Sequence, residues 1–374
     1  MIQNDPREKI KKFSLKELGG ALGDWGTLIP FVIGYVSIVG LNPAGIFLTL
    51  GLTNIILGIK FNLPLPVQPQ KTIGTIAISQ KWNPSLVIST GFATGIIWLL
   101  LGLSKFLGRI ANKIPMITVR GIQLGLGLIL GWTGITFISD DILLGLFCII
   151  VLLIFYKYKK VPSSIILIGI GILILVFTGA FSIGDLSFGL PFFQLTFPNW
   201  NDFLYGMIFA GIAQLFLTLT NVMIATVSLA KELFPEKIDE ISADSLAINM
   251  GLMNMINPFI QGMPLCHGSG GLAAQYAFGA RSGGSMIIEG SIEIILGLFF
   301  SDILFTFFIR FPQAILGAML FYTALLLGRI SFKEVNKRSM IVVVVSALFC
   351  FFINITIGFF VGLVLYLIFK KILQ

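Results

Sequence analysis

Long apolar runs separated by short polar loops constrain this chain more than any other feature of its sequence. A helix of roughly 20 apolar residues crosses a hydrocarbon core about 30 Å thick, and runs of about that length follow one another along the chain. Charged residues make up 11% of the sequence, whereas a soluble globular domain carries about a quarter. Lipid must therefore solvate most of the surface, which excludes a soluble enzyme.

Two kinds of segment can be separated by their length and polarity. Segments 68–80 and 268–280 are too short and too polar to cross a bilayer alone, and proline or glycine precedes each, so we predict that both are half-helices. With the longer runs they make fourteen segments in an all-α integral membrane protein. The longer runs are 18–39, 43–59, 85–103, 117–138, 141–156, 161–181, 203–228, 243–261, 284–301, 311–328, 339–353 and 355–370.

The positions of the basic residues test this count, because cytoplasmic loops collect Lys and Arg. With a cytoplasmic N-terminus, most of the 25 Lys and Arg residues fall in cytoplasmic loops. Lys81 and Arg310 fall outside, and Lys71 and Arg120 fall within spans. The pattern predicts a multi-pass protein of the cell membrane with both termini cytoplasmic. It also accounts for the net charge of +8 without a nucleic-acid partner.

Two internal matches indicate a repeat. Residues 51–65 match 251–265, with Asn54 and Pro64 aligned to Asn254 and Pro264, and residues 114–131 match 311–328. Each half, 1–190 and 191–374, then holds seven segments. An odd number gives the halves opposite orientations in the membrane, which is the inverted-repeat plan of secondary transporters.

The two broken segments, 63–74 and 263–275, occupy corresponding places in the halves. Non-helical chain at membrane depth must line a cavity or be buried in protein. Two half-helices that meet near the midplane would present free N–H groups and partial positive charge to a shared pocket. The sequence therefore predicts an anion-binding site between the two helix N-termini.

Lys71, at the start of the first half-helix, is the leading candidate ligand because an intramembrane charge usually belongs to a pathway. The alternative is a lysine that extends to the membrane interface. Neutral donors beside it and glycines that let the backbone approach an anion complete the candidate set, although helix packing explains the glycines equally well. The further candidates are Gln68, Gln70, Thr72, Gln214, Asn221, Ser269, Gly270 and Gly271.

Four other charged or titratable side chains, and one histidine, have different expected roles. Asp24 repels a dianion, so it is a candidate for a coupling proton or an ion pair with the lysine, and a structural hydrogen bond is an equal alternative. His267 could contact the anion, respond to pH or hold its loop. Glu289 and Glu293 fit packing or solvent-facing positions near the inner end of a helix. Arg120 is expected to extend to the interface.

The sequence gives little support for a catalytic site or a metal site. One histidine excludes a multi-histidine metal centre, and the three cysteines form no CxxC pair. A membrane-embedded hydrolase would need a nucleophile with its base, or paired aspartates on facing helices. We therefore expect no enzyme, no cofactor and no bound metal. An anion channel remains an alternative to a transporter, since the same helix termini would serve it.

Four motifs resemble the MOT1-type molybdate transporter family, relatives of the sulfate permeases. They are LGDWGTLIPFV (22–32), NIILGIKFNLPLPVQPQKTIG (54–74), GLMNMINPFIQGMPLCHGSGGLAAQYAFGARSGGSMII (251–288) and RFPQAILGAML (310–320). Gln70, Leu265 and Ser269 depart from the family's usual pattern and could tune selectivity.

The resemblance implies a secondary transporter of molybdate, or of tungstate or sulfate, that works by alternating access. It also implies a fold in which a core domain, about 17–104 and 202–302, slides against a gate domain, about 113–182 and 310–371. Sulfate or another anion is the alternative substrate, and a homodimer is common for this fold.

Overall fold

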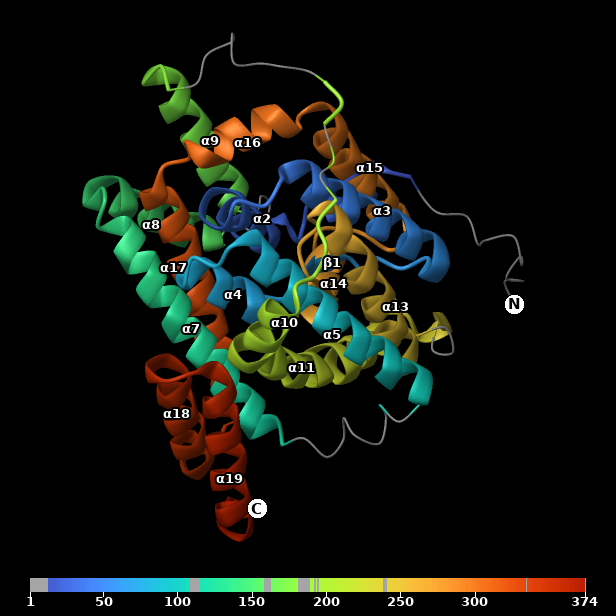
Figure 1. Ribbon diagram of the computed structural model, residues 1–374, viewed down its shortest axis with the longest axis vertical. Coiled ribbons are helices and arrows are strands. Elements are labelled where there is room, and N and C mark those ends of the chain that lie inside the picture. Colours follow the sequence, from blue (N-terminus) through green and yellow to red (C-terminus); the bar gives the residue numbers. More distant parts are fainter. Residues whose placement is uncertain are drawn as a thin grey trace.

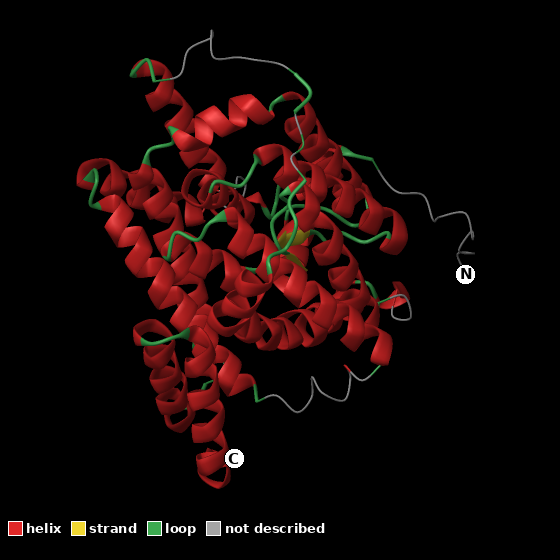
Figure 2. Ribbon diagram, in the orientation of Figure 1, coloured by secondary structure: helices red, strands yellow, loops and turns green. Residues whose placement is uncertain are grey.

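The structure is a computed structural model that describes residues 13–105, 107, 115–157, 163–180, 189–191, 193, 195–237, 241–333 and 335–373. Its described part consists almost entirely of helices (Figure 2). Some loops expected to carry basic residues, at 1–12 and 108–114, lie outside the described residues. In the first half the helices are α1 (Leu15–Ala21), α2 (Trp25–Gly34), α3 (Pro43–Phe61), α4 (Lys71–Ser79), α5 (Pro84–Ser104), α7 (Met116–Ile138), α8 (Ile142–Lys157) and α9 (Ser163–Phe177).

The second half repeats this order with one long, modified helix at its start. Its α10 (Trp200–Gly206), α11 (Ile212–Thr218) and α12 (Val227–Leu233) are joined by π-helical segments into one apolar helix, Trp200–Leu233. Further along come α13 (Ala243–Ile256), α14 (Ser269–Ala277), α15 (Gly284–Phe299), α16 (Ser301–Ile309), α17 (Gln313–Ser331), α18 (Lys337–Phe352) and α19 (Ile355–Leu373). The π-helical segments are Tyr35–Val39, Met207–Gly211 and Leu219–Thr226, and the 3-10 turns are Pro235–Lys237 and Asn257–Ile260.

The predicted segments coincide with helices whose ends differ by a few residues, except that the first, 18–39, is divided between α1 and α2, which are bent by 41°. The all-α membrane fold is confirmed. Among the described residues, five helices are long and apolar enough to span a membrane, or seven if each bent pair is one span. The number fourteen stays a prediction. One helix was not predicted: α16 turns by 85° from α15 and lies across the end of the molecule (Figure 1).

Local sequence sets where the central helices begin. Asn42 and Asn83 each precede a proline, and their side chains accept hydrogen bonds from Ala44 N and Leu86 N, both at 2.9 Å. Asparagine satisfies a free N–H at a helix start, and proline at the first position needs no N–H partner. The Asn-Pro dipeptide therefore fixes the starts of α3 and α5.

The inverted repeat is visible in the strands and in the helix pairs. Strands β1 (Val67–Pro69) and β2 (Leu265–His267) pair antiparallel, with Val67 opposite His267, so α4 and α14 leave the pair in opposite directions. Helix α3 packs on α15, and α5 packs on α13. The repeat exchanges these two pairs, because α13 corresponds to α3 and α15 to α5.

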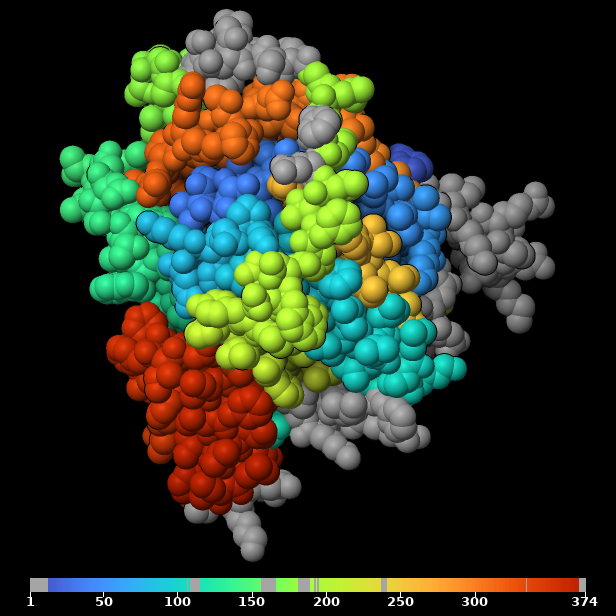
Figure 3. Space-filling model, in the orientation of Figure 1, coloured from blue at the N-terminus to red at the C-terminus, as the bar shows by residue number. Residues whose placement is uncertain are grey.

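A second group of helices forms beside this centre. Helices α7 and α17 pack closely, α18 and α19 pack together, and both of these contact α7 at the lower left of Figure 1. Glycine makes the α7–α17 approach possible: a Cβ on Gly317 would lie 2.6 Å from the Gly134 carbonyl oxygen. Helices α18 and α19 of this group form the red corner of the surface in Figure 3.

The surface of the molecule is more apolar than that of a soluble protein, and some carboxyl groups lie inside it. Large apolar side chains such as Leu143 and Phe177 are more than four-fifths exposed, and lie where lipid would surround the molecule. Carboxyl groups such as Asp24 and Glu289 are buried. Every buried polar group must then find a partner inside the protein or face a cavity, which directs attention to the centre of the fold.

Candidate functional site

Two asparagines hold the strand pair at the centre of the molecule. Asn254 of α13 bonds both backbone groups of Leu265, at 2.7 Å each. Its repeat equivalent, Asn54 of α3, accepts from Val67 N at 3.0 Å and donates to Glu293 Oε2 at 2.9 Å. Strand backbone at membrane depth has no water to satisfy it, so these side chains supply the missing partners.

A cavity of about 300 Å³ lies at the N-termini of both half-helices. Lys71 begins α4, and Ser269 and Gly270 begin α14, and all three line this cavity. Asn221, in the π-helical segment, lines it too and accepts a hydrogen bond from Ser269 Oγ at 3.1 Å. The structure thus brings the two predicted helix ends and the lysine together. We call this space the inner cavity.

The opposite wall of the inner cavity comes from α7 and the end of α17. Arg120 and Gln123 of α7 line it, and so do Met116 and Lys333, both of which are exposed. The cavity therefore opens at the face that carries the start of α7 and the end of α17. Arg120, which was expected to extend to the interface, is half-buried and lines this cavity, because α7 turns that side toward α4.

Gln214 and Thr72 lie just behind the lysine. The Gln214 side-chain oxygen accepts from Thr72 N in the first turn of α4 at 2.8 Å, and its amide donates to Thr218 Oγ1 at 2.8 Å. The Thr72 hydroxyl is buried without a hydrogen-bond partner. Gln214 thus satisfies one free N–H of α4 and orients its N-terminus, without lining the cavity itself.

Three candidate residues lie away from the cavity. Gln68 donates to Asp24 Oδ2 at 3.0 Å and to Thr27 Oγ1 at 2.9 Å. Gln70 donates to Leu265 O at 3.2 Å. Gly271 packs on Pro66, where an added Cβ would lie 3.0 Å from the proline ring. These residues support the strand pair and helix ends, and none of them lines the inner cavity.

A buried carboxyl cluster lies next to β1, where Gln68 bonds Asp24. Gln275 Nε2 donates both to Asp24 Oδ1 at 3.2 Å and to Glu289 Oε2 at 2.6 Å. Trp25 Nε1 donates to the other oxygen of Glu289 at 3.1 Å. Asp24, Glu289 and Glu293 are at most 1% exposed. The solvent-facing interpretation of Glu289 and Glu293 is wrong, because α15 turns that face toward α2 and α3.

Asp24 and His267 differ from the simplest expectations. Within the described part of the chain Asp24 forms no ion pair with Lys71, and its carboxyl oxygens accept from Gln68 and Gln275. His267 is wholly buried, stands opposite Val67 in the strand pair and does not line the inner cavity.

The carboxyl cluster was not predicted from the sequence, although one signal pointed to it: the four-residue spacing of Glu289 and Glu293 places both on one helix face.

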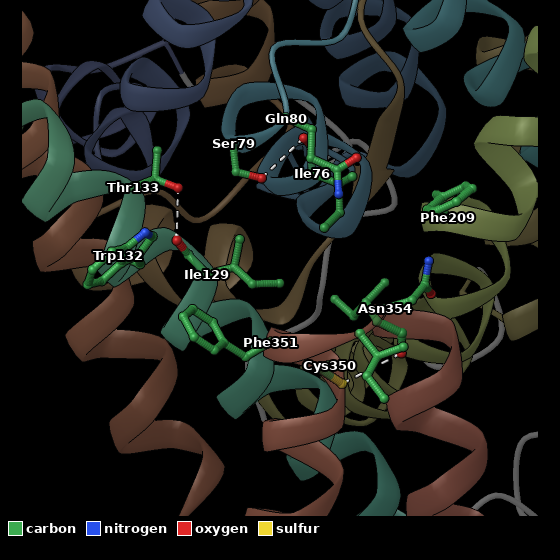
Figure 4. Close-up of a pocket in the computed structure, with 12 residues that line it drawn as sticks. Ile76, Ser79, Gln80, Ile129, Trp132, Thr133, Phe209, Cys350, Phe351 and Asn354 are labelled. Atoms are coloured by element: carbon green, nitrogen blue, oxygen red, sulfur yellow. Dashed lines mark hydrogen bonds between the residues drawn. The ribbon is translucent and has the colours of Figure 1, made fainter.

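A second cavity, also of about 300 Å³, lies at the opposite end of α4 (Figure 4). It is lined by Ser79 and Gln80 at the end of α4, Thr133 of α7, and Asn354 at the α18–α19 turn. The Ser79 and Thr133 hydroxyls donate to carbonyls of their own helices, Ile76 at 3.2 Å and Ile129 at 2.9 Å. None of its described lining residues is charged. We call this space the outer cavity.

Comparison with known proteins covers both halves of the chain. A family profile described as "Molybdate transporter of MFS superfamily" matches residues 16–130 and 206–327. "Molybdate transporter 2" of Arabidopsis thaliana is 31% identical in an alignment that covers 97% of this chain and 89% of that protein.

Two solved structures are similar in fold. The transmembrane domain of a cyanobacterium bicarbonate transporter, BicA, has a TM-score of 0.69 at 14% identity, over 93% of this chain and 97% of that one. Murine Solute Carrier 26 family member A9, an anion transporter in the inward-facing state, has a TM-score of 0.72 at 16% identity, over 98% of this chain and 70% of that one. The fold is therefore that of the sulfate permeases and their relatives.

Proposed function

The chain belongs to the molybdate transporter family, and from that membership we propose that it carries molybdate, or a similar tetrahedral oxyanion, across the cell membrane by alternating access. Family and fold make it a membrane transporter rather than an enzyme. The names of its relatives, which are molybdate transporters, support an anion as the substrate of this multi-pass protein. Tungstate and sulfate are the alternative substrates, because both are tetrahedral dianions like molybdate.

The observation that supports this proposal is the shared position of Lys71, Ser269 and Gly270 on one cavity. A dianion leaves water only if full positive charge and hydrogen-bond donors replace its hydration. Two helix N-termini supply free N–H groups and roughly half a positive charge each, and the lysine adds a full charge. Bonds to charged groups are the strong ones, worth about 1.5–3 kcal/mol each.

The two cavities support alternating access. The inner cavity meets the N-terminus of α4 at Lys71, and the outer cavity meets its C-terminus at Ser79 and Gln80. Between these ends the residues from Thr72 to Ile78 are buried. A core of residues 17–104 and 202–302 that slides past a gate of residues 113–182 and 310–371 would carry the site from one cavity to the other.

The carboxyl cluster is the proposed proton site for coupling. Asp24 and Glu289 accept from the same amide nitrogen of Gln275, in a region away from water. Two charges so placed are costly, and a proton held by the pair removes one of them. Gln68 connects Asp24 to β1 and so to the anion site. Movement of a proton with the anion also lowers the net charge transferred.

Uptake of labelled molybdate into proteoliposomes tests the proposed function. We expect Lys71→Gln to lower the affinity about ten- to a hundredfold, since it removes one charged contact worth about 1.5–3 kcal/mol. Lys231→Gln is the matched control, because this exposed lysine of α12 lies away from both cavities. The proposal fails if the wild-type protein neither binds nor transports molybdate, tungstate or sulfate.

A further inference from the structure

The inner cavity has two walls, and the proposed function uses only the wall formed by the half-helices. Its half-helix wall carries Lys71, and its α7 wall carries Arg120 and Gln123. Arg120 Nη1 donates to Gln123 Oε1 at 3.1 Å, so the amide orients the guanidinium along the cavity. The anion site therefore has a cationic group on each side.

Among the described residues that line the inner cavity, all the charged ones are basic. Lys71, Arg120 and Lys333 line it, and none of its described lining residues is acidic. Arg120 is half-buried, and its guanidinium keeps its positive charge at any physiological pH. Its planar fork of donors also matches two oxygens of an oxyanion at once. The wall thus has the chemistry to bind a tetrahedral dianion.

The inverted repeat shows that this wall has no counterpart. Aligned as 114–131 with 311–328, Arg120 corresponds to Gly317 and Gln123 to Leu320. Gly317 contacts the backbone of α7 and has no space for a side chain. The outer cavity accordingly has neutral polar groups, such as Gln80 and Asn354, and no charged residue in its described lining.

We propose that Arg120, held by Gln123, is a gate-side ligand of the oxyanion that acts only when the site is open toward the face bearing Lys333. The anion then contacts Lys71 and the helix ends on one side and the guanidinium on the other. When the core moves so that the site opens to the opposite face, the guanidinium is left behind. This inference rests on the proposed function and adds sidedness to it: the affinity for the anion differs between the two faces.

The test is the KM for labelled molybdate measured separately from each face, in vesicles of known orientation. For Arg120→Gln we expect a KM at least tenfold higher from the Lys333 face, and a change of less than about twofold from the opposite face. Arg120→Lys keeps the charge but loses the planar fork of donors, so its KM from the Lys333 face should lie between the values for the wild-type protein and for Arg120→Gln. Gln123→Leu, which installs the residue of the other repeat, should raise the KM less than Arg120→Gln and on the same face.

The matched control is Arg329→Gln, which removes the same charge from an exposed position in the last turn of α17 that does not line the inner cavity. It should leave both KM values unchanged. If Arg120→Gln behaves like Arg329→Gln, or raises both KM values equally, the inference is overturned. That outcome is distinct from failure of the proposed function, in which the wild-type protein itself transports no oxyanion. If Arg120→Gln does not fold, the sided change in Arg120→Lys and Gln123→Leu decides the question.

Discussion

Buried polar side chains in this molecule have two separate tasks. Asn54 and Asn254 satisfy strand backbone, and their repeat-related positions show that this task belongs to both halves. Glu289 and Glu293 break the repeat, because positions 200 residues earlier hold Ser89 and Ala93. The carboxyl cluster is therefore not a requirement of the fold, which favours a role in coupling.

Replacement of the shared carboxyl group tests that role. Glu289→Gln has nearly the same shape but cannot exchange a proton, and Asp24→Asn does the same for its partner. We expect molybdate uptake by the wild-type protein to increase as the pH falls on the side from which the anion enters, because a proton moves with it. Either variant should show a flat pH profile between pH 5 and 8.

Asp302→Asn is the control for this series, since Asp302 is exposed in the first turn of α16. It should keep the wild-type pH profile. A wild-type pH profile in Asp24→Asn and Glu289→Gln would remove proton coupling through this cluster and leave the anion site untouched.

At the scale of elements, the half-helices could be predicted but their surroundings could not. Short polar segments between prolines and glycines indicate a break at membrane depth, and the structure has α4 and α14 there. The strand pair cannot be predicted from the sequence, because three residues carry no period and their partners lie 196 to 200 positions away. That pairing decides that Gln68 faces Asp24 while Lys71 faces the cavity.

Two further features, the helix α16 and the position of Arg120, could not be predicted from the sequence for physical reasons. Residues 303–309 are mostly apolar but too few to cross a membrane alone, so hydropathy gave no sign of the helix α16 that turns by 85° from α15. Arg120 was assigned to the interface because a one-dimensional reading shows how far a residue is from a helix end. It does not show which helix that residue faces, and α4 faces it across the inner cavity.

The α7–α17 crossing provides a prediction at this scale. In Gly317→Ala the new Cβ would lie 2.6 Å from the Gly134 carbonyl oxygen, which is backbone and cannot move aside easily. We expect a lower midpoint of thermal unfolding in detergent and reduced transport, because the two helices are forced apart. Gly328→Ala is matched to it on the same helix, since its Cβ meets nothing within 4 Å.

For Gly328→Ala we expect a stabilisation of about 0.5–1 kcal/mol, since alanine loses less backbone freedom than glycine in a helix. A lower unfolding midpoint for Gly317→Ala and a higher one for Gly328→Ala would show that the contact between α7 and α17, and not helix propensity, determines the stability. Equal shifts would contradict the close packing of α7 on α17.

At the scale of the whole molecule, the arrangement of the two cavities favours a transporter over a channel. The cavities meet α4 at opposite ends, and the buried residues Thr72–Ile78 lie between them. A channel needs one continuous path in a single state, whereas alternating access needs a barrier that the site carries with it. The closed arrangement around α4 favours the second.

Counterflow tests this difference directly. In vesicles preloaded with unlabelled molybdate, a carrier transiently accumulates labelled molybdate above its outside concentration, whereas a pore brings the label only to equilibrium. We expect strong counterflow in the wild-type protein, and loss of it in Lys71→Gln, because the substituted site cannot hold the anion during the movement. The same vesicles, challenged with outside sulfate or tungstate, rank the competing dianions. Discrete unit conductance in planar bilayers, without counterflow, would instead identify a channel and rule out the sliding core.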